Sequence, residues 1–166
     1  MSAKKSQSLL LVEDDSNDVI FFRRGLKGSA ILAHLRVAED GQEAVAYMEG
    51  TGRFENRTDH PLPALIILDL KLPKKPGLEF LEWLRKDSRF KDTPVIILTS
   101  SKEPRDLLRA QELGVTGYHV KPVVFKDLCE LVHSFAEYWI QITQVSQSSP
   151  STEVRSNAER GPSWKL

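Results

Sequence analysis

The sequence has little of several features that would point to particular classes of protein. Its 166 residues include one cysteine, Cys129, which excludes an internal disulfide and a multi-cysteine metal cluster. Lysine plus arginine balances aspartate plus glutamate at 23 each, so no net charge attracts nucleic acid or an anionic membrane. No apolar run approaches the roughly 18 residues of a membrane span, and the polar start does not resemble a signal peptide. We therefore expect a cytoplasmic protein that binds neither nucleic acid nor a membrane.

Short apolar runs that end in polar residues are the most informative pattern in the chain. These runs and the residues after them are 9–12 with Glu13, Asp14 and Asp15, 65–68 with Asp69, 95–98 with Thr99, and 117–120 with Lys121. Buried parallel strands place the groups at their carboxyl ends along one edge of the sheet. We therefore expect carboxylates, a hydroxyl and an ammonium to meet at this edge.

Apolar residues at helical spacing fill the intervals between these runs. The expected helices cover about residues 16–27, 44–50, 78–84, 103–113 and 125–142, and a weaker strand covers 34–38. Residues 51–63 are expected to form an unusually long loop. Five strands alternating with five helices predict an α/β fold, a flavodoxin-like three-layer sandwich with a parallel sheet in the order 2-1-3-4-5.

The length fits one domain of ordinary size with additional segments. We expect an N-terminal extension over residues 1–8, the folded domain over 9–142 and a disordered C-terminal tail over 143–166. The tail is rich in serine, glutamine, asparagine, arginine and glutamate, with almost no apolar periodicity. Since no second folded domain is expected, output through an attached DNA-binding domain is not expected either.

Three carboxylates in one small volume predict a divalent cation site. Glu13, Asp14 and Asp69 would repel one another, which raises their pKa values unless a cation is bound. Mg²⁺ suits this site because it takes one or two carboxylates, several waters and a phosphate oxygen. The main-chain carbonyl of Lys71 could add a ligand. Asp69 is then the candidate nucleophile toward phosphorus, with Lys121 stabilising charge on the transferring group.

An acyl phosphate on Asp69 would give the Thr99 hydroxyl a new acceptor. Such a charge-assisted hydrogen bond is worth about 1.5–3 kcal/mol, which shifts a two-state equilibrium about 10- to 150-fold. Taken singly, these residues also have ordinary interpretations. The acidic triplet 13–15 could be acids at a helix start and Asp69 could cap a loop, and a Lys-Pro pair by itself indicates no function. Their joint placement at one edge favours the phosphorylation site.

The set of motifs closely resembles the receiver domain of two-component response regulators, over about residues 9–140. The shared features are the acidic triplet after the first strand, Asp69 followed by Leu72-Pro73 and Gly77, residues 94–99, residues 117–122, and the steps of 30 and 22 residues from Asp69 to Thr99 and on to Lys121. The resemblance implies that a histidine kinase phosphorylates Asp69 and that Mg²⁺ is held by Asp14 and, through water, by Glu13. It also implies that Lys121 contacts the phosphoryl group, that Thr99 and Tyr118 are switch residues, and that the Lys121–Pro122 peptide bond is cis.

Several further segments resemble the single-domain regulators paired with phytochrome-type histidine kinases. They are residues 47–54, the loop 60–63, residues 98–103 and the pair Tyr138-Trp139. This resemblance implies a phytochrome-type kinase as a partner, with output through protein contacts or onward transfer to a histidine phosphotransfer protein. His119, the pair Lys75-Pro76 and the long tail depart from the family pattern.

The fifth helix carries more apolar surface than packing on a sheet needs. On a helical wheel, Phe125, Leu128, Val132, Phe135 and Trp139 face the sheet, while Leu131 and Tyr138 widen the apolar arc to roughly 200°. This excess predicts a homodimer surface, and burial under the tail is the alternative.

Other classes of function remain as alternatives. A phosphatase or phosphotransferase resembling the haloacid-dehalogenase group would carry a second aspartate where this chain has Lys71. Nucleotide hydrolysis lacks a G-x-x-x-x-G-K-[ST] loop, and the acidic triplet would repel a flavin phosphate. A receiver that binds partners without phosphorylation is disfavoured by the intact Asp14, Asp69, Thr99 and Lys121. The sequence therefore predicts a phosphoacceptor protein rather than an enzyme acting on an external substrate.

Overall fold

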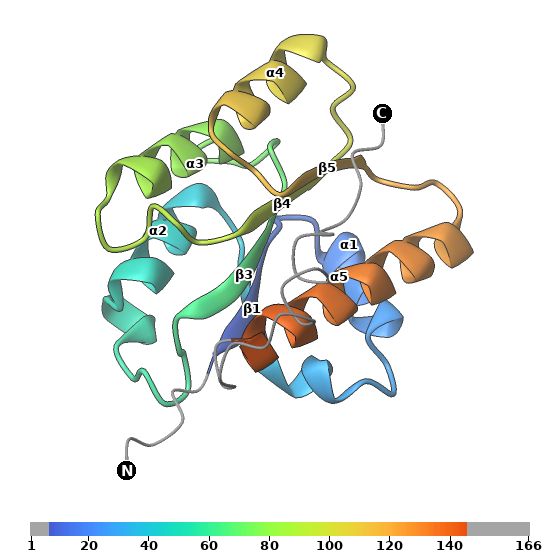
Figure 1. The fold of residues 1–166 in the computed structure, drawn as a ribbon, viewed down its shortest axis with the longest axis horizontal. Coiled ribbons are helices and arrows are strands. Elements are labelled where there is room, and N and C mark those ends of the chain that lie inside the picture. The colour runs from blue at the N-terminus through green and yellow to red at the C-terminus, as the bar shows by residue number, and fades with distance from the viewer. Residues whose placement is uncertain (1–6, 146–166) are drawn as a thin grey trace.

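The computed structural model describes residues 7–145, which form a parallel sheet between two layers of helices (Figure 1). The strands are β1 (Ser8–Val12), β2 (Leu35–Ala38), β3 (Pro63–Leu68), β4 (Val95–Thr99) and β5 (Gly117–Val120). All neighbouring strands pair in parallel, in the order β2-β1-β3-β4-β5. The predicted fold class and strand order are confirmed.

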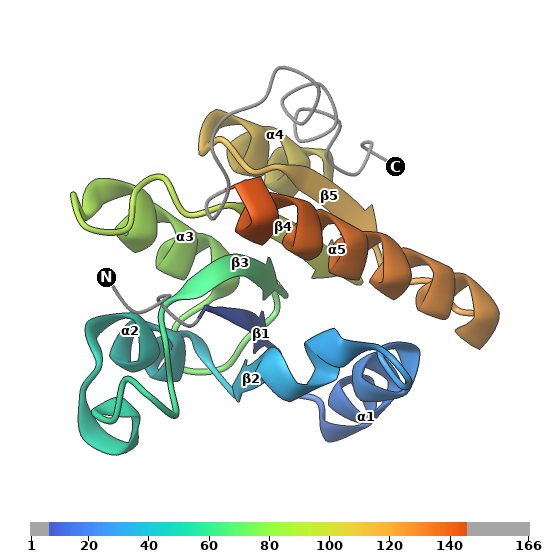
Figure 2. The ribbon, with the colours of Figure 1, turned by 60° about the horizontal axis from the view of Figure 1, so that its bottom comes forward.

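The helices divide between the two faces of the sheet. They are α1 (Ser16–Gly25), α2 (Gly41–Glu49), α3 (Gly77–Lys86), α4 (Pro104–Glu112) and α5 (Phe125–Val145), with short 3₁₀ segments at Ala30–His34 and Gly52–Phe54. Figures 1 and 2 show α1 and α5 on one face and α2, α3 and α4 on the other. None of the helices within residues 7–145 is both long and apolar enough to cross a bilayer.

Strand residues supply alternate side chains to two separate cores. Leu10, Ile66 and Ile97 pack with residues of α2 and α3, whereas Leu9 and Ile67 pack with residues of α1 and α5. This alternation follows from the period of two along a strand. Because the central strands are covered on both faces, their residues are apolar except for Ser8 at the start of β1 and Thr99 at the end of β4. Polar groups can therefore follow only at the strand ends.

Capping side chains fix where two helices begin beside the sheet edge. Asp15 Oδ1 accepts hydrogen bonds from the main-chain N–H groups of Asn17 at 2.8 Å and Asp18 at 3.2 Å, so α1 starts directly after the acidic triplet. Asp40 Oδ1 caps α2 in the same way by accepting from the N–H of Glu43 at 2.8 Å. These short connections hold the first turn of α1 against the ends of the strands.

The element boundaries differ slightly from the predicted domain limits of 9–142. β1 begins at Ser8, which is fully buried, and α5 continues through Thr143 to Val145. The rest of the predicted extension and tail, residues 1–6 and 146–166, lies outside the described residues. The predicted loop over 51–63 contains the 3₁₀ segment Gly52–Phe54.

Two further expectations were wrong. Phe125 does not face the sheet: it is 46% exposed and packs against Phe21 of α1 with ring centroids 5.8 Å apart, because the first turn of α5 lies beside α1. Val132, Phe135 and Trp139 are buried as predicted, and Leu131 and Tyr138 pack partly against the same core. The Lys121–Pro122 bond is trans, as are all peptide bonds in residues 7–145; trans is the isomer that X–Pro bonds favour intrinsically.

Candidate functional site

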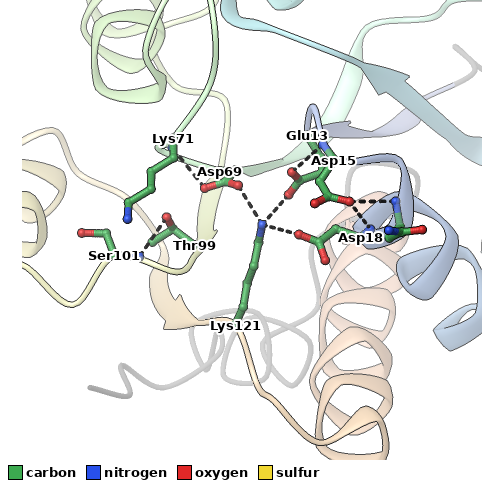
Figure 3. A network of polar contacts seen from close by, with 9 residues as sticks. Glu13, Asp15, Asp18, Asp69, Lys71, Thr99, Ser101 and Lys121 are labelled. Carbon is green, nitrogen blue, oxygen red and sulfur yellow. Dashed lines mark hydrogen bonds and ion pairs between the residues drawn. The ribbon is translucent and has the colours of Figure 1, made fainter.

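The four strand ends meet at the carboxyl edge of the sheet, as the sequence predicts. Glu13 follows β1, Asp69 follows β3, Thr99 ends β4 and Lys121 follows β5. Figure 3 shows the side chains of Glu13, Asp69 and Lys121 directed toward one another. Glu13 is 3% exposed, Asp69 is 4% exposed and Thr99 is fully buried. The edge is therefore a largely desolvated polar site rather than a set of surface charges.

The Lys121 ammonium lies at the centre of this site. Its Nζ is 2.7 Å from Glu13 Oε2, 2.7 Å from Asp18 Oδ2 and 2.7 Å from Asp69 Oδ2. Burial lowers the pKa of Lys121, but hydrogen bonds to the three carboxylates outweigh it and hold the pKa above its ordinary value. Lys121 therefore remains charged and neutralises part of the acidic cluster.

Glu13 titrates differently from an ordinary glutamate. Burial is the main cause that raises its pKa to about 7, and the charge on Asp69 adds to this effect. The hydrogen bond from Lys121 lowers the pKa of Glu13 without cancelling the effect of burial. A raised carboxyl pKa in the folded protein means that folding takes up a proton between about pH 4.5 and 7.

This proton uptake predicts how stability depends on pH in the absence of a divalent cation. The contribution of protonated Glu13 is fully present below its ordinary pKa of 4.5 and is lost as the pH rises through about 7. Relative to Glu13→Gln, the wild type should lose on the order of 2 kcal/mol of unfolding free energy between about pH 5 and 8. Urea denaturation of both proteins across this range measures the difference, and parallel pH profiles would contradict it.

Glu13, Asp14 and Asp69 fit a divalent cation. One carboxylate oxygen from each lies within 4.8 Å of the others, with Glu13 and Asp69 buried and Asp14 exposed. Hard oxygen ligands of this kind, with one side open to water, are what Mg²⁺ and similar ions prefer. The main-chain N–H of Lys71 donates to Asp69 Oδ1 at 3.1 Å, which orients that carboxylate. A role for the Lys71 carbonyl as a ligand stays a prediction.

Gly77 allows α3 to begin close to Asp69. A Cβ atom at residue 77 would clash with the main-chain oxygen of Asp69 and would lie 2.7 Å from the Cα of Leu70. The N–H of Gly77 also donates to the Leu70 carbonyl at 3.0 Å. The glycine in the segment after Asp69 is therefore explained by a close approach of two backbones.

Hydrogen bonds connect the end of β4 to Tyr118 and α4. Thr99 Oγ1 accepts from the N–H of Ser101 at 3.3 Å, and the Tyr118 hydroxyl donates to the Ser101 carbonyl at 3.1 Å. The Ser101 hydroxyl donates to Asp106 Oδ2 of α4 at 2.6 Å. Tyr118 is buried, and burial raises the pKa of its hydroxyl. If Thr99 moves, Ser101 is therefore expected to move with it, together with its hydrogen bonds to Tyr118 and to Asp106 of α4.

Comparison with known proteins decides the family. A family model described as the response regulator receiver domain matches residues 9–133. The chain belongs to this family. Response regulator Rcp1 of Synechocystis sp. is 37% identical to this receiver domain protein over 133 residues, which cover 80% of this chain and 88% of Rcp1.

Solved structures agree with this assignment. The receiver domain resembles the Mn(2+)-bound form of Rcp1 with a TM-score of 0.73 and 36% identity, over 81% of this chain and 94% of that one. It resembles the phosphorylated cyanobacterial phytochrome response regulator RcpA with a TM-score of 0.74 and 32% identity, over 87% of this chain and 99% of RcpA. The resemblance to receivers and to phytochrome-associated regulators, predicted from the sequence, is confirmed.

Two contacts of the receiver site were missed from the sequence. Asp18 binds Lys121, and Asp106 binds Ser101. Both aspartates lie in the first turn of a helix, where acidic side chains are common because their negative charge interacts favourably with the helix dipole. Nothing in the sequence distinguishes them from such acids. The partner of Asp18, Lys121, is more than a hundred residues away, and the partner of Asp106, Ser101, lies in the loop before α4.

Proposed function

We propose that this receiver domain is the phosphoacceptor of a two-component system and that a histidine kinase phosphorylates it on Asp69. The observation that carries the proposal is the contact of 2.7 Å between Asp69 Oδ2 and the Lys121 ammonium, beside a cluster of carboxylates that fits a divalent cation. Glu13, Asp14 and Asp69 would hold Mg²⁺, which supplies positive charge to the transferring group when it is bound.

The residues of the site have separate tasks in this reaction. A carboxylate oxygen of Asp69 attacks phosphorus, the phosphorus–nitrogen bond of the donor phosphohistidine breaks, and the electron pair leaves with the imidazole, which takes a proton from water. The N–H of Lys71 holds the other carboxylate oxygen, so Oδ2 faces Lys121. The ammonium then stabilises the negative charge on the phosphoryl oxygens.

The acyl phosphate would act on the rest of the domain through Thr99. Its hydroxyl would donate to a phosphoryl oxygen, and the hydrogen bond from the N–H of Ser101 to Thr99 Oγ1 would then be altered. Ser101 also binds Tyr118 and Asp106, so the change would reach α4 and β5. We infer that Thr99 and Tyr118 are the switch residues for output through protein contacts or onward transfer to a histidine phosphotransfer protein.

A phytochrome-type histidine kinase is the partner that the relatives favour. RcpA is described as a phytochrome response regulator, and this chain is similar to it over 87% of its length. In this proposal the protein catalyses only its own phosphorylation and dephosphorylation, and acts on no external substrate.

A homodimer through α5 is a further part of the proposal. Leu131 and Tyr138 are partly buried within the chain, so the large apolar side chains exposed on the described part of α5 are Phe125 and Ile140, which is 39% exposed. Light scattering of the full chain with and without phosphorylation should give twice the mass of one chain in at least one state. A single-chain mass in both states would contradict the dimer.

The phosphoacceptor proposal is tested with a small acyl-phosphate donor. With Mg²⁺, intact mass spectrometry of the full chain should show one added phosphoryl group that alkaline treatment removes. After chelation of divalent cations the incorporation should fall to the background. A folded protein that takes up no phosphoryl group from this donor or from a histidine kinase would instead favour a receiver that binds partners without phosphorylation.

A further inference from the structure

We propose that Asp18 is a positioning residue that anchors the Lys121 ammonium while the phosphoryl group is transferred. This inference rests on the proposed function of Asp69. Asp18 Oδ2 is 2.7 Å from Lys121 Nζ, as close as the oxygens of Glu13 and Asp69. Figure 3 shows Lys121 reaching between Asp69 on one side and Asp18 of α1 on the other.

The ammonium has as many carboxylate partners as it has N–H donors. A lysine ammonium has three N–H donors and no acceptor, and it has three carboxylate partners here. Two of these partners, Glu13 and Asp69, also belong to the group of oxygens that fits a divalent cation, whereas Asp18 lies outside that group. Of the three partners, Asp18 is therefore the one that would neither coordinate the cation nor carry the phosphoryl group.

Asp18 is well placed to hold Lys121 at the solvent side of the site. The side chain of Asp18 is 36% exposed, compared with 4% for Glu13 and 5% for Asp69. Its own main chain is fixed, because its N–H donates to the capping side chain of Asp15. A lysine side chain on its flexible four-carbon stem loses orientation readily. An anchor on a helix start limits that freedom and keeps Nζ directed toward Asp69.

Asp15→Asn provides a matched control for Asp18→Asn. Both changes remove one negative charge from the start of α1, and asparagine at position 15 still caps the helix. The side chain of Asp15 accepts from the N–H groups of Asn17 and Asp18 rather than from Lys121. A general effect of charge on an anionic donor or on α1 will therefore appear in both variants, and the loss of the anchor only in Asp18→Asn.

Two measurements on the full chain test the proposal. The first is the rate at which an amine-reactive ester modifies Lys121 in metal-free protein, followed by peptide mass spectrometry. This rate should be about tenfold higher in Asp18→Asn than in Asp15→Asn, because the ammonium is no longer held on its exposed side. With Mg²⁺ and a small acyl phosphate, the maximal rate of phosphorylation should fall about tenfold without a rise in the half-saturating donor concentration. Asp18→Glu, which keeps the carboxylate, should recover part of both effects.

The outcomes separate this proposal from the function on which it rests. If Asp18→Asn matches Asp15→Asn in either measurement, Asp18 does not position Lys121 for the transfer and the proposal is overturned. If the wild type takes up no phosphoryl group, the proposed function fails, and the inference about transfer falls with it. Faster modification of Lys121 in Asp18→Asn would then show only that the aspartate holds the amine.

Discussion

Lys121→Met is expected to lower the free energy of unfolding by about 3 kcal/mol at pH 8 without divalent cations. The substitution leaves Glu13 and Asp69 without their shared cation, and both side chains are about 5% exposed or less. Breaking a buried ion pair on one side strands the remaining charge, which is the main cost. At pH 5 the loss should be smaller, because Glu13, whose pKa is already about 7, takes up a proton. Mg²⁺ should restore part of the stability at pH 8.

The same substitution is expected to slow phosphorylation of Asp69 about 100-fold or more, since it removes a preorganised charge from the transferring group. Urea denaturation at both pH values and the rate of phosphoryl uptake measure the two effects. Lys126→Met, at an exposed position of α5, removes the same charge as a control. If Lys121→Met is as stable as the wild type at pH 8 and takes up the phosphoryl group at the wild-type rate, the ammonium neither stabilises the site nor assists the transfer.

Gly77→Ala is expected to reduce both stability and phosphorylation. The new methyl group would clash with the main chain of Asp69 and lie 2.7 Å from the Cα of Leu70. Backbone atoms cannot move away as a side chain can, so we expect a loss of about 3 kcal/mol in unfolding free energy. A displacement of the Asp69 carboxylate by even part of an ångström would slow the transfer, because a shift of about 1 Å can cost about 100-fold.

Gly25→Ala is the matched control for this change. Gly25 is also a buried helical glycine, but the three atoms nearest to its Cβ would all belong to the side chain of Val132, the nearest at 3.1 Å. The better helix propensity of alanine should offset that contact, so the unfolding free energy should change by less than about 1 kcal/mol. Thermal or urea denaturation compares the two variants. Equal effects of both changes would show that the approach of α3 to Asp69 is not tight.

The fold was predictable because the central strands carry the apolar runs 9–12, 65–68 and 95–98, each of which is followed directly by a polar residue. That pattern identifies buried parallel strands, and a doubly wound sheet then brings Glu13, Asp69, Thr99 and Lys121 to one edge. The carboxylates, the hydroxyl and the ammonium at this edge follow from residue types alone, whereas the roles of the switch residues were expected from the family resemblance. Because the argument relies on where strands end, it predicts the position only of residues that directly follow a strand.

The remaining features depend on where helices pack in three dimensions. Asp18 looks like an ordinary first-turn acid until α1 is placed beside the end of β5. Phe125 fits the apolar stripe of α5, but its turn lies against Phe21 rather than over the sheet. Asp106 likewise becomes part of the site only through Ser101. Helical periodicity gives the direction of a side chain around its axis, not the neighbour at each turn.

The most direct test of the account is phosphoryl uptake from a small acyl phosphate with Mg²⁺, compared between the wild type and Asp69→Asn. The variant should fold, because it removes one of three carboxylates around a single ammonium. We predict one base-labile phosphoryl group on the wild type and none on the variant. Equal uptake by a folded Asp69→Asn protein would contradict the assignment of Asp69 as the phosphoacceptor.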